Sequence, residues 1–311
     1  YIMGKLYNSI ISFGIGDALV VHVKNELRKN LVHNKIVDMI GYGSFDYKEG
    51  TYSDDTCLVL ATIDSICNIK YIDYDNIANC YLDWLLDNKY SCGKTFDVGV
   101  TTKASLIKFS NVRYDAHLCG GCRVNDNGNG ALKRVLPLAF YFFYSDTNES
   151  RIVHVVEKFS SITHGNDVCM LGSLIYVLFT INILKGLSKE EAYSKLNEFE
   201  YSKYFNSNTI DLYSRVINLE LIFLDSSAIK SSGYCIDTLE AVIWSILNGK
   251  DFSSSVLLGV NLGDCSDSIG ALIGGIAGII YGDIPVRWID KLTNHKYIED
   301  LCYKYLEVLN Q

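Results

Sequence analysis

Residues 261–282 read NLGDCSDSIGALIGGIAGIIYG and join an acidic loop to a glycine-rich helix. Gly270, Gly274, Gly278 and Gly282 recur at every fourth position, which places them on one helical face. A face without side chains lets a second helix approach closely. The pattern therefore predicts that this helix packs tightly against another and holds the acidic loop in a fixed position.

The loop ahead of this helix crowds oxygen-bearing side chains around the predicted helix start. Asp264, Ser266, Asp267 and Ser268 all lie within it. Such groups can cap the free amides of a first helical turn, or they can bind a hard cation. For this segment taken alone, a capped buried helix and a metal site are both open interpretations.

A second acidic cluster, SDDT at residues 53–56, again precedes an apolar run with helical spacing. Adjacent carboxylates repel each other, and a divalent cation makes such crowding favourable at neutral pH. Oxygen ligands from the two loops would suit Mg²⁺ or Mn²⁺ better than zinc. The predicted metal ligands are Ser53, Asp54, Asp55, Asp267 and Ser268.

Seven segments resemble motifs of the ADP-ribosylglycohydrolase family, which includes dinitrogenase reductase-activating glycohydrolase and the eukaryotic ADP-ribosyl-acceptor hydrolases. They are residues 14–18 (GIGDA), 53–56 (SDDT), 96–102 (FDVGVTT), 127–134 (NGNGALKR), 163–164 (TH), 233–238 (GYCIDT) and 284–288 (IPVRW). They occur in the family's order along most of the chain, and residues 127–134 closely match the pattern NGNGALmR. The resemblance implies an all-α, single-domain orthogonal helical bundle over residues 1–311.

Composition independently favours one mostly helical domain. The chain has 311 residues, of which 49% are apolar, and only two prolines. Apolar residues recur mainly at three- to four-residue spacing, which is typical of helices. A net charge of −8 offers no basic patch for a nucleic-acid backbone, so a nucleic acid is expected only as a modified acceptor.

One residue departs from the family's second metal motif, NLGGDTDTIGA. An ungapped comparison places Asp267 on the second acid and Cys265 on the first, and a thiol is a poor ligand for a hard cation. A compensated shift would instead place Asp264 on the first acid. We favour the ungapped pairing, with Asp264 as a partial substitute ligand. The resemblance implies two Mg²⁺ or Mn²⁺ ions, and Cys265 leaves one ion as the alternative.

The loop at residues 119–130 is the predicted contact for ADP-ribose. Glycines let backbone amides approach a pyrophosphate closely, and asparagines offer donors and acceptors to ribose hydroxyls. An ordinary Asn-Gly turn is the alternative. The predicted substrate-binding residues are Asn127, Gly128, Asn129, Gly130, His164 in the pocket wall, and Tyr234 as a stacking ring. A packed core tyrosine is the alternative for Tyr234.

The family mechanism implies hydrolysis of the glycosidic bond between ADP-ribose and an acceptor, through a state with oxocarbenium character. Asp55 is predicted to take the proton of the attacking water, and Asp126 to bind the distal ribose or help to activate water. Asp17 is predicted to support the metal loops from behind. Three hypotheses stay open: an active ADP-ribosyl hydrolase, a binding-only pseudoenzyme, and a hydrolase of another ADP-ribose-like or nucleoside substrate.

Ten scattered cysteines suit buried free thiols better than a disulfide framework. The pair at 119 and 122 has the spacing of half a zinc site, but no second pair or nearby histidine completes it. Residues 168–184 contain polar side chains and are predicted to form a buried helix that is too short for a membrane span. We expect no signal peptide, a cytoplasmic monomer, and ADP-ribose or an ADP-ribosylated protein as the partner.

Overall fold

A computed structural model describes residues 2–311, with side chains from residue 4 onward. Its helices are α1 (Ile2–Ala18), α2 (Arg28–Leu31), α3 (Asp54–Ile69), α4 (Tyr74–Asp87), α5 (Val100–Val112), α6 (Leu136–Tyr144), α7 (Glu149–Ser160), α8 (Asp167–Leu184), α9 (Lys189–Lys195), α10 (Ser207–Leu212), α11 (Ser214–Ile217), α12 (Cys235–Asn248), α13 (Phe252–Val260), α14 (Ser266–Ile280), α15 (Val286–Lys291) and α16 (His295–Leu309). Short 3₁₀ turns, including η1 (Val21–Val23) and η3 (Leu132–Arg134), lie between them. Within residues 2–311 there is no β-strand, so the all-α prediction is confirmed.

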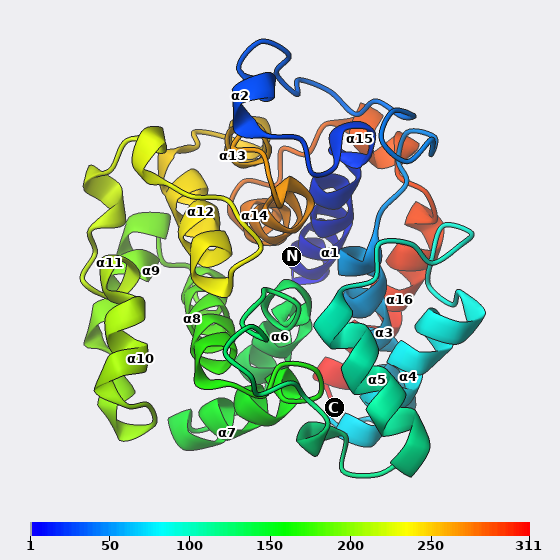
Figure 1. The fold of residues 1–311 in the computed structure, drawn as a ribbon, viewed down its shortest axis with the longest axis vertical. Coiled ribbons are helices and arrows are strands. Elements are labelled where there is room, and N and C mark those ends of the chain that lie inside the picture. The colour runs from blue at the N-terminus through cyan, green and yellow to red at the C-terminus, as the bar shows by residue number, and fades with distance from the viewer. Residues whose placement is uncertain (1) are drawn as a thin grey trace.

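The glycine-rich helix α14 packs against α1, as its spacing predicts (Figure 1). Gly270, Gly274 and Gly278 lie in turn against the backbone of residues 16, 12 and 8, so the two helices are antiparallel. A Cβ atom at Gly274 would lie 2.1 Å from the carbonyl oxygen of Ser12, which leaves no room for any side chain. This contact places the end of α1 beside the start of α14.

Helix α3 begins at Asp54, directly after Ser53, as the second acidic motif predicts. Its apolar residues, including Leu58 and Ile63, are fully buried in the hydrophobic core. The helix packs against α4 and α16 and also contacts α1 and α14. Its amino-terminal turn is thereby directed at the junction of α1 and α14.

Two helical segments are long and apolar enough to cross a membrane by length and composition, 4–23 and 167–184. The second segment corrects the expectation that residues 168–184 are too short for a span. In the most apolar stretch of the first segment 78% of the residues are buried inside the protein, and in that of the second segment 72% are buried. Such burial is typical of core helices. The predicted buried helix is therefore confirmed as α8, with Asn166 as its cap.

Three loops meet beside the helical core and are joined by two isolated bridges. Gly121 pairs with His164, and Gly128 pairs with Tyr234. The segment at residues 119–130 is thus held between the turn before α8 and the turn before α12. All ten cysteines lie in the described part of the chain as free thiols, and most of them are buried.

Candidate metal centre and substrate loops

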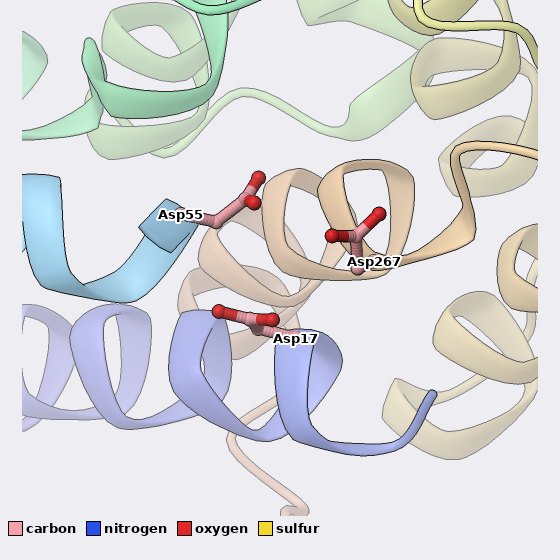
Figure 2. Close-up of side chains that lie close together, drawn as sticks. All are labelled: Asp17, Asp55 and Asp267. Carbon is pink, nitrogen blue, oxygen red and sulfur yellow. The ribbon is translucent and has the colours of Figure 1, made fainter. Parts of the chain in front are cut away.

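Three carboxylates from three helix ends point toward one another (Figure 2). Asp17 lies one residue before the end of α1, whereas Asp55 and Asp267 lie in the first turns of α3 and α14. One oxygen of each lies within 4.8 Å of the others, and all three residues are buried. The amino-terminal ends of α3 and α14 carry partial positive charge, which favours carboxylates there.

Asp17 supports the start of α3 from behind, as predicted. Its oxygens accept hydrogen bonds from the backbone N–H groups of Ser53 (3.0 Å) and Thr56 (3.2 Å). The hydroxyl groups of the same two residues donate to it at 2.8 and 2.7 Å. Burial raises the pKa of Asp17 to about 6, and the nearby Lys24 ammonium opposes this rise. Asp17 therefore positions the acidic motif of α3.

Asp55 lies at the centre of the acidic group and is fully buried. Burial raises its pKa well above the ordinary value, the Lys133 ammonium opposes the rise, and Asp267 adds to it. Within the described residues its Oδ1 atom has no hydrogen-bond partner. A buried carboxylate oxygen without a partner is costly, so it marks a place where a cation would be favourable.

Two buried lysines that the sequence analysis missed are inserted among these acids. Lys24 follows η1, and its Nζ atom lies 2.5 Å from Asp97 Oδ2 and 2.5 Å from Asp267 Oδ2. Lys133, in η3, forms an ion pair with Asp54 and lies 3.5 Å from Asp55 Oδ2. Burial acts to raise the pKa of Asp267, but Lys24 and Lys133 together lower it. Asp267 is thus held as a carboxylate.

Two groups of acids could hold a divalent cation, and they differ in what already lies among them. Among the described residues, two sets of acids have converging oxygens: Asp17, Asp55 and Asp267; and Asp54, Asp97 and Asp267. Each set keeps one carboxylate oxygen without a hydrogen-bond partner in the described chain, Oδ1 of Asp55 in the first and Oδ1 of Asp54 in the second. The second set already surrounds the ammonium of Lys24. The donor atoms are hard oxygens, which suit Mg²⁺ or Mn²⁺.

The structure separates the roles of Asp264 and Cys265. Asp264 accepts a hydrogen bond from Ser231 at 3.1 Å and belongs to neither converging set in the described chain, and its role as a substitute ligand stays a prediction. Cys265 Sγ instead lies 4.0 Å from Asp267 Oδ1. Burial raises the pKa of Cys265 to about 12, with Asp267 adding to the rise, so the thiol stays protonated. The ungapped pairing of the motif is supported by this arrangement.

The two serines predicted as ligands serve their neighbouring acids. The Ser53 hydroxyl donates to Asp17 and lies 3.2 Å from Asp55 Oδ2. Ser268 is buried in the first turn of α14, and its backbone N–H donates to Asp267. Their ligand roles remain predictions, because the structure shows them as supports of the carboxylates.

Residues 127–130 are held against the start of α12 by backbone hydrogen bonds. The carbonyl of Asn127 accepts from Cys235, and the N–H of Asn129 donates to Gly233 at 2.9 Å. The Asn129 side chain donates to Thr238 at 3.0 Å and to Cys265 at 3.3 Å. Asn129 thus ties the predicted substrate loop to the second acidic loop. Tyr234 is half-buried directly before α12.

His164 lies behind Gly130, three residues before α8, and is buried. A Cβ atom at Gly130 would lie 2.3 Å from the His164 ring, so the loop rests directly on the imidazole. Burial, together with the charges of Arg134 and Lys133, lowers the pKa of His164 to about 3. His164 is therefore neutral and supports the loop, and its place in the wall of a substrate pocket stays a prediction.

Arg134 is a second support that the sequence analysis did not single out. Its fully buried guanidinium donates to the carbonyl oxygen of Gly130 and to Thr163 Oγ1, both at 2.7 Å. It also lies against the rings of Tyr81 and Phe159. Its position at the end of the matched motif at 127–134 was the available signal.

Asp126 lies apart from the acidic centre. Its carboxylate accepts from Arg123 Nε at 3.1 Å and from Thr101 at 3.3 Å, and a hollow of about 210 Å³ adjoins it. The Arg123 hydrogen bond lowers the pKa of Asp126. Asp126 belongs to neither converging set in the described residues. Its catalytic role therefore stays a prediction, and a lowered pKa suits ribose binding better than proton uptake.

Comparisons with known proteins show which sequences and which fold the chain resembles. A sequence model for "ADP-ribosylglycohydrolase" matches residues 3–311. An ADP-ribosylarginine hydrolase, Tri1 of Serratia proteamaculans, is 29% identical, over 96% of this chain and 78% of its own. The ADP-ribosyl-[dinitrogen reductase] glycohydrolase of Rhodospirillum rubrum is 26% identical, and the similarity covers 93% of this chain and 90% of that protein. A solved "ADP-ribosylglycohydrolase-related protein complex" has the same fold, with a TM-score of 0.82, 22% identity and 99% of each chain covered.

Proposed function

The chain belongs to the ADP-ribosylglycohydrolase family, so we propose that it hydrolyses the glycosidic bond that joins ADP-ribose to a modified protein side chain. One observation of the structure carries the proposal. Carboxylates from three helix ends converge at Asp17, Asp55 and Asp267 beside the loop at residues 127–130. This arrangement combines a cation-binding group with a backbone surface for a pyrophosphate.

Arginine is the first acceptor to test, because a relative that covers nearly the whole chain is an ADP-ribosylarginine hydrolase. Hydrolysis would break the bond between the anomeric carbon and the acceptor nitrogen. The oxygen of water would bond to that carbon, and the leaving nitrogen would keep the electron pair and take up a proton. The products are free ADP-ribose and an unmodified side chain.

Asp55 and Asp267 would hold one Mg²⁺ or Mn²⁺ ion, with Asp17 adjoining them. When bound, such an ion binds ribose hydroxyls and makes a nearby water more acidic. Asp55 is the candidate acceptor of the water proton, because its carboxylate keeps an oxygen, Oδ1, that no described group bonds. Asp17 keeps Asp55 in position through its hydrogen bonds to the first turn of α3.

The loop at residues 127–130 would position the substrate. Its backbone is fixed by Gly233, Cys235 and the His164 ring, so it loses little freedom when a ligand binds. Tyr234 would stack on the ribose or adenine beside Gly128, with which it forms a bridge. Binding of the ADP-ribose moiety would then orient the anomeric carbon toward Asp55.

The test is the release of free ADP-ribose from a peptide that carries ADP-ribosylated arginine. We expect release with Mg²⁺ or Mn²⁺ and little release after chelation. Peptides modified on serine, and a nucleic acid with a modified end, identify the acceptor class. No release from any of these substrates would overturn the proposed activity.

A binding-only protein is the second candidate, and a specific observation favours it. Cys265 replaces an expected acid beside Asp267, and its thiol stays protonated. Lys24 and Lys133 also neutralise part of the acidic group. ADP-ribose binding in calorimetry, together with no release from any modified acceptor, would establish this alternative.

A further inference from the structure

Lys24 occupies the place that a cation would take between three carboxylates. Its Nζ atom lies 2.5 Å from Asp97 and 2.5 Å from Asp267, and a third oxygen, of Asp54, is 3.9 Å away. These three acids form one of the two converging sets in the described residues. The ammonium therefore lies among the same oxygens that would bind a metal ion.

The side chain of Lys24 is only 3% exposed, so its charge is held inside the protein. A buried ammonium is stable only where carboxylates surround it closely. A divalent ion bound by the same oxygens would have to lie within a few ångströms of the ammonium and would repel it strongly. Lys24 and a metal ion therefore exclude each other at this set.

The other converging set is occupied only in part: Lys24 pairs with Asp267 and Lys133 with Asp55, but within the described residues neither lysine pairs with Asp17. Lys133 pairs with Asp54 and approaches Oδ2 of Asp55, whereas Oδ1 of Asp55 has no partner among the described residues. Asp17 and Asp267 each have an oxygen within 4.8 Å of one oxygen of Asp55. The ammonium of Lys24 thus lies among the second set, whereas the first set keeps an oxygen, Oδ1 of Asp55, that no described group bonds.

We propose that Lys24 supplies one of the positive charges of this site from within the chain, so that the protein binds one divalent ion where a second would otherwise bind. The inference rests on the proposed function in so far as it concerns the same site. Lys24 also limits the chemistry of this position, because a fixed ammonium, unlike a metal ion, cannot exchange, bind water as a ligand or make that water acidic.

The net charge of the acids and lysines at this site is consistent with the binding of one divalent ion. Five carboxylates, those of Asp17, Asp54, Asp55, Asp97 and Asp267, face two ammonium groups. One divalent cation neutralises most of the remaining negative charge. A second one would give the buried group more positive than negative charge, which is unfavourable without further ligands.

The test counts Mn²⁺ ions on the full chain by equilibrium dialysis and records their electron paramagnetic resonance spectrum. We expect the wild-type protein to bind one Mn²⁺ per chain with the spectrum of an isolated ion. Lys24→Ala should bind one ion more than the wild type, and its spectrum should show the spin coupling of two neighbouring ions. Lys103→Ala, which removes an exposed lysine of α5, should behave as the wild type.

No gain of an ion in folded Lys24→Ala would overturn the proposal. If that variant does not fold, the wild-type spectrum decides alone, because two coupled ions in the wild type would also overturn it. These counts do not depend on hydrolysis. A protein that releases no ADP-ribose but gives the expected counts would lose the proposed function and keep this inference.

Discussion

Gly16 and Gly270 touch backbone to backbone where α1 crosses α14. A Cβ atom at Gly16 would lie 1.9 Å from the carbonyl oxygen of Gly270, and one at Gly270 would lie 2.5 Å from that of Gly16. Asp17 follows the first glycine, and Asp267 lies one helical turn before the second. The distance between these two acids is therefore set by the absence of side chains at the crossing.

Gly16→Ala should separate the two helices and destabilise the fold by about 2 kcal/mol or more, because a methyl group forced into a packed contact shifts the backbone. It should also weaken Mn²⁺ binding, since Asp17 and Asp267 move apart. Urea unfolding and calorimetry check both effects. Gly4→Ala is the matched control, because a Cβ atom there meets nothing within 4 Å in the described structure. Equal stability of the two variants would contradict this account.

Asp55→Asn should lower Mn²⁺ affinity more than about 100-fold, above the loss typical of a residue that only supports a ligand. Asp126→Asn is the comparison, since Asp126 pairs with Arg123 outside the acidic centre. It should leave Mn²⁺ affinity unchanged and weaken ADP-ribose binding. Calorimetry with each ligand separates the two roles. Similar Mn²⁺ affinities for both variants would remove Asp55 from the predicted ligands.

The sequence predicts the helices and the close packing of the glycine-rich helix, because both follow from the spacing of residues that are near one another in the sequence. Glycines four residues apart predict that another helix crosses α14 closely, although not that this helix is α1, and the motif at residues 53–56 predicts the start of α3. The two buried lysines were missed because their partners come from distant segments. Lys133 did leave a signal, since it stands where the motif NGNGALmR has an apolar residue. Lys24 has no comparable signal in the matched motifs.

Lys133→Met removes the ammonium that pairs with Asp54 and Asp55. With a chelator present, we expect a loss of about 3–5 kcal/mol in the free energy of unfolding, because buried carboxylates lose their partner. Saturating Mn²⁺ should restore part of this stability by binding to the folded state alone. Guanidinium unfolding with and without Mn²⁺ measures both. The exposed Lys103→Ala should show neither change, and a fully stable Lys133→Met with chelator would contradict the prediction.

His164 should make the protein less stable in acid. The unfolded residue titrates near 6.5, whereas in the folded state burial, Arg134 and Lys133 lower its pKa to about 3, and Asp126 opposes them only partly. Between these values the unfolded chain binds more protons, so the free energy of unfolding falls as the pH falls. The loss from pH 7 to pH 5 should be roughly 2 kcal/mol.

His164→Gln isolates this contribution, because glutamine cannot take up the proton. The variant should be less stable at pH 7, and the difference from the wild type should shrink toward pH 5. Asp17, whose raised pKa has the opposite effect below pH 6, is present in both proteins and cancels in the comparison. Parallel stability curves for the two proteins would show that His164 does not titrate as described.

Cys265→Asp tests which residue stands at the first acid position. The thiol lies 4.0 Å from Asp267 Oδ1 and stays protonated, so a carboxylate there should add a hard ligand and tighten Mn²⁺ about tenfold or more. Without metal the same variant should be less stable, because the added charge is buried among other acids. Asp264→Asn should change Mn²⁺ affinity less than about twofold, since its carboxylate accepts from Ser231. If Asp264→Asn instead abolishes Mn²⁺ binding while Cys265→Asp leaves it unchanged, the shifted pairing is correct and Asp264 is the ligand.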